Sequence, residues 1–224
     1  MALLEYKPPQ FPYLEFLYRD DDIAVMLKPS GLLSVPGKAL EHRDSLQSRL
    51  ARVLPTTTIV HRLDMATSGI MIVALNKPAH RHISKQFELR QVNKTYYALI
   101  KDAPTQISGT IELPLICDWP NRPKQMVDLE RGKPAKTHYD LIESYDGYSL
   151  VRLKPVTGRS HQLRVHMLSL GHAILGDRLY ACAEGIKMAN RLCLHASFIE
   201  FVHPNTNERL RFESTPDFSF VTKR

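Results

Sequence analysis

Short apolar runs dominate the pattern of hydrophobic and polar positions along this chain, and helical spacing is confined to a few stretches. The runs are bounded by turns that contain proline, glycine or aspartate, as strands usually are. The predicted strands cover residues 16–18, 23–27, 58–60, 70–75, 94–100, 111–116, 137–144, 148–153, 191–201 and 208–212. Apolar residues at helical spacing predict helices at residues 45–54, 78–90, 161–170 and 181–189.

Polar residues and helix breakers mark the ends of two of these helices. Asp44 is predicted to cap the first helix, and Pro55 follows it. Ser160 is predicted to cap the third helix, which ends before Gly171.

Arg164 occupies an unusual position on the third helix. Leu163, Met167 and Leu170 form the predicted apolar stripe, so Arg164 stands among core-facing neighbours. A desolvated guanidinium without an anionic partner is costly, and Asp64 is the partner that we expect. The alternative is a surface pair with a nearby acid, which is usual for helix arginines.

The pattern shows no boundary between domains. The chain contains no Gly/Ser tract, charge block, repeat or low-complexity run. Many strands in series with a few helices are typical of the α+β class. We therefore predict one domain over residues 1–224, with flanking helices and loops around a mixed sheet.

Composition adds a basic balance to this picture. Thirty lysine and arginine residues against 23 aspartate and glutamate residues give a formal charge of +7, as expected of a protein that meets a polyanion. Charge alone leaves nucleic-acid binding and a solvated basic face equally open. No apolar run approaches the roughly 20 residues of a membrane span, and residues 1–12 lack a signal-peptide core, so we expect a cytoplasmic protein that does not contact membranes.

Cysteine and histidine do not indicate a metal site. Cys117, Cys182 and Cys193 are widely spaced without a CxxC pair, which indicates reduced thiols. The ten histidines have no acidic or cysteine partner at a familiar zinc spacing. We therefore expect no bound metal.

The best candidate for chemistry lies between the predicted strands at 58–60 and 70–75. Residues 61–69 read HRLDMATSG, where one carboxylate, Asp64, stands among basic and small side chains. A short turn between two strands presents Asp64 from a rigid support, where a nucleophile or base would be placed. The alternative is a turn residue that accepts backbone amides or pairs with Arg62, the commoner role of an aspartate in a turn.

Two aromatic features add to this candidate. Tyr96 and Tyr97 are consecutive in a predicted strand, so their rings point to opposite faces and only one can face Asp64. Trp119 lies in an irregular loop at residues 117–125 beside Arg122 and Lys124. Such a loop either stacks on a base and neutralises phosphates or is pinned by a buried tryptophan.

Ordered motifs over nearly the whole chain resemble those of the RluA family of RNA pseudouridine synthases. They are Lys28-Pro29-Ser30-Gly31-Leu32, His61-Arg62-Leu63-Asp64 with Thr67-Ser68-Gly69, Lys94-x-Tyr96, Gly132-Lys133-Pro134-Ala135, Thr157-Gly158-Arg159-x-His161-Gln162-x-Arg164-x-His166, Gly176-Asp177 with Tyr180, and Leu194-His195-Ala196. The resemblance implies the pseudouridine synthase catalytic fold, a mainly antiparallel sheet with the catalytic cleft across it. It also implies that no N-terminal S4 RNA-binding domain precedes the catalytic domain.

The resemblance assigns the catalytic roles. Asp64 is the catalytic aspartate of uridine isomerisation, in which the base leaves C1′, turns and rejoins the ribose through C5. Attack on C1′, removal of the 2′ proton and addition to C6 all stay open for it. Arg164 keeps Asp64 ionised and oriented, while Tyr96 stacks on the target base and takes the C5 proton.

The resemblance also implies how the RNA is held. Leu194 packs on the other face of the uracil, with plain core packing as the alternative, and Arg62 fills the space that the flipped uridine leaves. His61 is a further expected substrate contact. The expected phosphate contacts are Lys28, Arg122, Lys124, Lys133 and Arg159.

The implied partner is RNA, without a cofactor, because an isomerisation has no net redox change. The implied substrates are a uridine in a structured loop of large-subunit (23S) ribosomal RNA and one in a tRNA anticodon stem-loop, and we expect a monomer. The alternatives are a catalytically inert RNA-binding protein of the same fold and a hydrolase with Asp64 as nucleophile. The hydrolase ranks last, since no second carboxylate accompanies Asp64.

Overall fold

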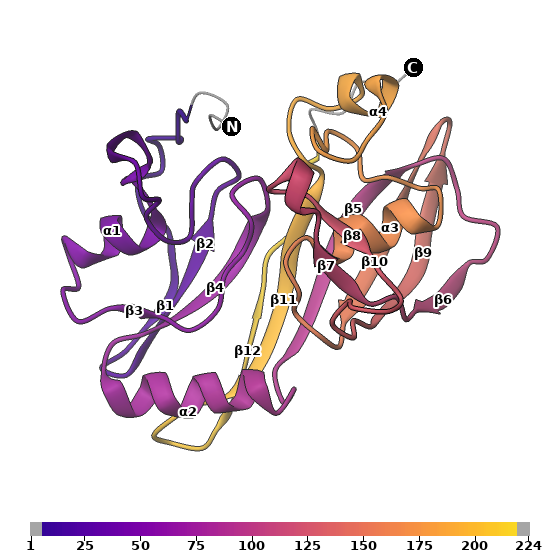
Figure 1. The fold of residues 1–224 in the computed structure, drawn as a ribbon. Helices are drawn as coiled ribbons and strands as arrows, with labels where there is room; N and C mark the ends of the chain where they lie inside the picture. Colours follow the sequence, from indigo (N-terminus) through magenta and orange to yellow (C-terminus); the bar gives the residue numbers. More distant parts are fainter. Residues whose placement is uncertain (1–5, 219–224) are drawn as a thin grey trace. The chain divides into compact units, whose positions relative to one another are not determined.

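The computed structural model describes residues 6–218, which divide into two compact units (Figure 1). The Asp64 unit comprises residues 6–94 and 196–215, and the Arg164 unit comprises residues 95–195 and 216–218. The chain crosses between the units inside two strands, β5 (Asn93–Lys101) and β11 (Leu194–Val202), and again after residue 215. Each unit is described by itself, and the single domain stays a prediction.

The Asp64 unit contains a sheet in the order β1-β2-β4-β11, with β3 paired to β4 and β12 to β11. The β1–β2 hairpin turns at residues 20–22 as predicted, and Asp20 accepts the amides of Asp22 and Ile23 at 2.8 Å each. The β1–β2, β2–β4, β3–β4 and β11–β12 pairs are antiparallel. Their bounds are β1 Phe16–Arg19, β2 Ile23–Lys28, β3 Thr58–Ile59, β4 Ser68–Ala74 and β12 Arg209–Glu213.

Helix α2 (Lys77–Glu88) covers this sheet, as Figure 1 shows at the base of the unit. Asn76 caps it by accepting the Ala79 amide at 2.9 Å. Its predicted inward residue Ile83 is fully buried with Ile72 of β4 and Phe201 of β11. The Gln86 side chain exchanges two 2.8 Å hydrogen bonds with the Val202 backbone, which fixes the helix to β11.

Helix α1 (Leu46–Ala51) follows the 3₁₀ turn η1 (Leu40–His42) and begins one residue later than predicted. Ser45, not Asp44, is the cap, in a reciprocal capping box with Ser48. The Asp44 cap was therefore wrong. Its carboxylate instead pairs with Arg49 of the same helix at 2.7 Å.

The Arg164 unit contains strands in the order β5-β10-β9-β6 and a separate two-stranded sheet, β7–β8. The hairpin predicted around residues 145–147 is confirmed. The apolar run predicted as one strand at 111–116 is two strands, because Pro114 lies between them and cannot donate a ladder hydrogen bond. The bounds are β6 Ser108–Ile111, β7 Leu115–Cys117, β8 Gln125–Val127, β9 Thr137–Tyr145 and β10 Tyr148–Pro155.

Helix α3 (Gln162–Ser169) carries Arg164, and α4 (Ala183–Lys187) is a short helix further along the chain. His161, in the left-handed region at φ 53°, occupies the cap position, so the cap predicted at Ser160 was wrong. The helix is buried on all sides over residues 162–167, whereas Leu170 is 37% exposed. Leu163 and Met167 are buried as predicted, but Leu170 is not, and the helix has no single apolar stripe because its polar residues are also buried with internal partners.

These elements confirm the predicted α+β class with a mainly antiparallel sheet. Within residues 6–218, no helix combines the length and the apolar character that crossing a membrane requires.

Candidate active site

Asp64 lies on a loop between β3 and β4, as the pattern of apolar runs predicted. The loop is closed by the Thr67 amide, which donates to the Asp64 carbonyl at 3.1 Å. Leu63 and Thr67 on either side are buried, while Asp64 is partly exposed. Buried anchors therefore hold the loop and leave its carboxylate at the surface of the unit.

A second loop, residues 28–34, supports the Asp64 loop through its backbone. The ammonium of Lys28 is fully buried and donates to the carbonyls of Pro29, Leu32 and Met65 at 2.8, 2.7 and 3.2 Å. A phosphate cannot reach an amine buried among carbonyls. The position of Lys28 thus argues against the phosphate contact that we expected and for a role in holding the two loops together.

Three further residues of the 28–34 loop bond the Asp64 loop. Gly31 donates its amide to the Met65 carbonyl at 2.8 Å, and Ser30 Oγ donates to the Ala66 carbonyl at 2.6 Å. Ser34 Oγ donates to the Leu63 carbonyl at 2.6 Å and accepts the Leu63 amide at 3.2 Å. Both sides of Asp64 are consequently fixed to one supporting loop.

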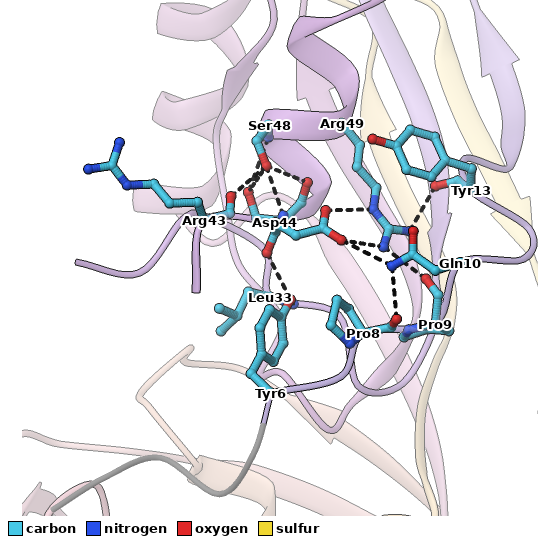
Figure 2. A network of polar contacts seen from close by, with 11 residues as sticks. Tyr6, Pro8, Pro9, Gln10, Tyr13, Leu33, Arg43, Asp44, Ser48 and Arg49 are labelled. Carbon is cyan, nitrogen blue, oxygen red and sulfur yellow. Dashed lines mark hydrogen bonds and ion pairs between the residues drawn. The ribbon is translucent and has the colours of Figure 1, made fainter. Parts of the chain in front are cut away.

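The supporting loop is itself anchored to α1 and to the N-terminal segment, residues 6–13 (Figure 2). Tyr6 donates its hydroxyl to the Asp44 carbonyl at 2.8 Å and accepts the Leu33 amide at 3.0 Å. The Leu46 amide donates to the Leu33 carbonyl at 2.8 Å. The loop is therefore fixed to α1 and to the N-terminal segment as well as to the Asp64 loop.

Arg49 is the centre of the network in Figure 2 and is fully buried. Its guanidinium binds both carboxylate oxygens of Asp44 at 2.8 and 2.7 Å. It also donates to the carbonyls of Pro9 at 2.8 Å and Tyr13 at 3.1 Å. One side chain thereby ties the N-terminal segment to α1.

His61 is built into the framework of the Asp64 unit. Its Nε2 accepts the Ile72 amide at 2.9 Å, and its ring stacks on Phe87 with centroids 4.5 Å apart. Burial, together with the charge of Lys94, lowers the pKa of His61 to about 3. A neutral imidazole that accepts a strand amide positions the loop, and this argues against the substrate contact that we expected.

Arg62 and Gly69 complete the loop. The Arg62 side chain is exposed next to the partly exposed Asp64. Gly69 has a φ of +120°, and a Cβ there would overlap the backbone of Ala196 in β11. Only glycine allows the strand after the loop to approach β11 this closely.

In the Arg164 unit, Arg164 is held by Asp177, a partner that the sequence analysis did not name. Its Nε and Nη2 each donate to one oxygen of the Asp177 carboxylate at 2.7 Å, and both side chains are buried. Asp177 Oδ1 also accepts the amides of Leu179 at 3.0 Å and Tyr180 at 3.3 Å. The Gly176-Asp177 motif was the available signal, but spacing alone could not show that it faces α3.

Tyr180 connects α3 to the β7–β8 hairpin. Its ring lies under the Arg164 guanidinium, with Cζ 5.0 Å from the centroid. Its hydroxyl lies 2.7 Å from His161 Nδ1 and accepts the Gln125 amide at 2.7 Å. The sequence analysis assigned no role to this tyrosine either.

Gln162 and His166 fix α3 from the opposite side. Gln162 Oε1 accepts the Arg159 amide at 3.0 Å and the Thr157 hydroxyl at 2.7 Å. The His166 ring is fully buried between Thr137 Oγ1 at 2.9 Å and the Leu113 carbonyl at 3.0 Å. The polar residues of this motif therefore hold the helix in place.

Tyr96 and Tyr97 point to opposite faces of β5, as alternation predicted. Tyr96 pairs with Leu153 and Tyr97 with Arg152 of the antiparallel neighbour β10. Leu194, the first residue of β11, is 3% exposed.

The remaining predicted contacts lie on loops of the Arg164 unit, and the side chains of Arg122, Lys133 and Arg159 are exposed. Arg159 Nε donates to the Pro134 carbonyl at 3.1 Å. Lys133 exchanges two backbone hydrogen bonds with Leu115, and the Arg122 guanidinium lies over Trp119. Lys124 is partly buried beside it.

The Asp64 unit brings together Asp64, Arg62, His61 and Lys28. The Arg164 unit contains Tyr96, Arg164, Leu194, Arg159, Arg122 and Lys133. The predicted pair of Asp64 with Arg164 joins residues of different units and stays a prediction.

The fold and the anchored Asp64 loop do not by themselves define an activity, but comparison with known proteins identifies the class of this protein. Residues 22–169 match the family described as RNA pseudouridylate synthase. This chain therefore belongs to the RNA pseudouridine synthases, which are isomerases that act on RNA.

Within this class, the chain is similar to proteins named dual-specificity RNA pseudouridine synthase RluA. It is 53% identical over 219 residues to that of Escherichia coli (strain K12), covering 97% of this chain and 100% of the relative. It is 51% identical to that of Vibrio parahaemolyticus, covering 92% of this chain and 85% of the relative. The solved structure of human RNA pseudouridylate synthase domain containing 1 superposes with a TM-score of 0.78 at 31% identity, covering 95% of this chain and 87% of that chain. The solved structure of human RNA pseudouridylate synthase domain containing 4 superposes with a TM-score of 0.74 at 25% identity, covering 92% of this chain and 90% of that chain.

Proposed function

We propose that Asp64 is the catalytic aspartate with which this enzyme isomerises uridine to pseudouridine in RNA. The single observation that carries the assignment is the doubly anchored loop, whose one carboxylate is partly exposed while Leu63 and Thr67 are buried. A displacement of a reacting group by about 1 Å can cost about 100-fold in rate. Lys28, Ser34 and Gly31 supply that positioning.

The remaining groups are proposed to act on the uracil base and on the charge of Asp64. Arg164, oriented by Asp177, is proposed to hold Asp64 ionised. Tyr96 is proposed to stack on the uracil and to accept the C5 proton of the rearranged base, with Leu194 on the other face. The glycosidic bond to N1 breaks and the C1′–C5 bond forms, and one proton moves from C5 to N1, so no oxidant or water is consumed.

The substrates are proposed to be two RNAs, a structured loop of 23S ribosomal RNA and a tRNA anticodon stem-loop. The relatives named above carry the words dual-specificity in their names, and a shared loop shape would suit both RNAs. Flipping the uridine out of its stack costs a few kcal/mol, and exposed Arg62 is proposed to fill the space. We further propose that the enzyme acts as a monomer in the cytoplasm.

The inert RNA-binding alternative is not favoured, because Asp64, Tyr96 and Arg164 are all present, whereas an inert relative should have lost one.

The test is Asp64→Asn, with Asp21→Asn as a matched control in the exposed β1–β2 turn. Asp64→Asn should abolish pseudouridine formation on a uridine-bearing stem-loop while RNA affinity stays within a few fold, because the amide keeps the shape but not the charge. The control should retain full turnover. Turnover by a clean Asp64→Asn preparation would overturn the assignment.

The sites in the cell can be identified by carbodiimide labelling and primer extension on RNA from a strain that lacks this protein. We expect one lost stop in 23S ribosomal RNA and one in a tRNA. If both stops persist, the proposed substrates are wrong.

A further inference from the structure

Trp119 lies on an exposed arm of the Arg164 unit. The arm, residues 115–127, consists of β7, the short 3₁₀ turn η2 (Trp119–Asn121) and β8. Strands β7 and β8 form their own two-stranded sheet. The Trp119 side chain is 64% exposed. Of the two readings of this loop, pinning by a buried tryptophan is therefore excluded.

The ring is held by a cation. The Arg122 guanidinium lies over it with Cζ 4.5 Å from the ring centroid, a geometry in which the arginine is attracted to the electron-rich face. Trp119 is 64% exposed even with the arginine in place. Most of the indole therefore stays accessible to a further flat partner.

The arm that carries this ring is well ordered at its base. Asp118 donates its amide to the Lys124 carbonyl and accepts Asn121 Nδ2, at 3.0 and 2.9 Å. The Gln125 amide donates to the Tyr180 hydroxyl, and Leu115 packs on Val165 of α3 in a small buried cluster. These contacts fix the base of the arm to α3, which carries Arg164.

The chemistry around the ring favours a nucleic acid over a protein partner. Exposed indole and guanidinium planes are the groups on which unpaired bases stack, and the arm adds Lys124 beside them. Leu129, just beyond the arm, is 76% exposed, but an aliphatic side chain offers no stacking surface.

We propose that Trp119 and Arg122 form a stacking platform for an unpaired base of the RNA substrate, separate from the target uridine. The proposal rests on the proposed function only in requiring RNA as the substrate. It would give the enzyme a second point of contact with the RNA, which raises affinity and selects loops that have an unpaired base at the right distance.

The first test uses the fact that Trp119 is the single tryptophan of the chain. Titration of the protein with an unlabelled stem-loop RNA should quench the indole emission with saturation, at the concentrations at which a labelled copy of the RNA changes anisotropy. Complete binding by anisotropy without any change in emission would overturn the platform. This measurement needs no turnover, so it is independent of the role of Asp64.

The second test is kinetic. Trp119→Ala should raise KM for the stem-loop roughly 5- to 150-fold, the range expected for one stacked base, with kcat unchanged at saturation. Trp119→Phe should restore most of the affinity, and Leu129→Ala should behave as wild type. An unchanged KM in Trp119→Ala, or an equal rise in Leu129→Ala, would show that the arm does not bind RNA by stacking.

Discussion

For Arg164, the sequence predicted that a buried anionic partner exists but did not identify Asp177 as that partner. Its place among apolar neighbours correctly required a buried anionic partner. Asp177 is such a partner, thirteen positions further along the chain, but nothing in the spacing of the motifs selects it over Asp64. Which acid meets a buried arginine is decided by tertiary structure, where the turn after Gly176 returns toward α3.

The buried pair gives the first prediction at this scale. Asp177→Asn should lower the free energy of unfolding by about 3 to 5 kcal/mol, since it removes one partner of a buried ion pair. Chemical denaturation measures the loss. Asp140→Asn is the matched control, because its pair with Arg152 is about one-third exposed on both sides and should cost less than about 1 kcal/mol. Equal losses in the two variants would contradict this account of Asp177.

At the scale of elements, most strand and helix positions were predictable, whereas the strands on either side of Pro114, strand β8 and two helix caps were not. Apolar runs place β2, β4 and β10 within a residue or two of their observed bounds. Asp44 and Ser45 are both good capping residues, and the choice between them depends on Arg49, which needs the carboxylate of Asp44. The local sequence pattern does not show that Arg49 requires this carboxylate.

The N-terminal segment is the element whose role was least visible. It has no regular structure, yet its carbonyls at Pro9 and Tyr13 bind Arg49, and Tyr6 binds Leu33. Irregular segments lack periodicity, so only their side-chain partners reveal that they are fixed.

Arg49→Met should therefore release this segment. We expect faster hydrogen exchange at the Leu33 amide, which donates to Tyr6, and a stability loss of about 1 to 3 kcal/mol, because the carbonyls of Pro9 and Tyr13 lose their donor. Arg52→Met, in the exposed C-terminal turn after the same helix, is the control and should leave both unchanged. Unaltered protection of Leu33 in Arg49→Met would show that the segment is held by other contacts.

For the whole molecule, the motifs in order were sufficient for the class, and the basic charge agreed with an RNA substrate. Composition alone identified neither the class of protein nor its substrate, because a charge of +7 also suits a solvated surface. Two compact units were not visible in the sequence, because the chain crosses between them inside β5 and β11 and no linker marks the crossing.

Acid stability is a property of the whole molecule to which one buried histidine contributes. His61 has a pKa of about 3 in the folded protein, against an ordinary value of 6.5. Between these pH values the unfolded chain binds a proton at this histidine and the folded protein does not. Its contribution is present above about pH 6.5 and is lost as the pH falls toward 3, at no more than about 1.4 kcal/mol per pH unit.

His61→Gln removes the titrating group and should reduce the slope of unfolding free energy against pH between 6.5 and 4. Denaturant titrations across that range decide the matter, and an unchanged slope in His61→Gln would refute the assignment.

The buried ammonium of Lys28 has a practical consequence. Reagents that acylate amines need a deprotonated, accessible nitrogen, and this nitrogen is enclosed by three carbonyls, one of them from the Asp64 loop. Acylation at Lys28 must wait until the two loops separate, whereas exposed lysines react at once. The rate of its modification, read by mass spectrometry, therefore reports how often the Asp64 loop opens in the native protein.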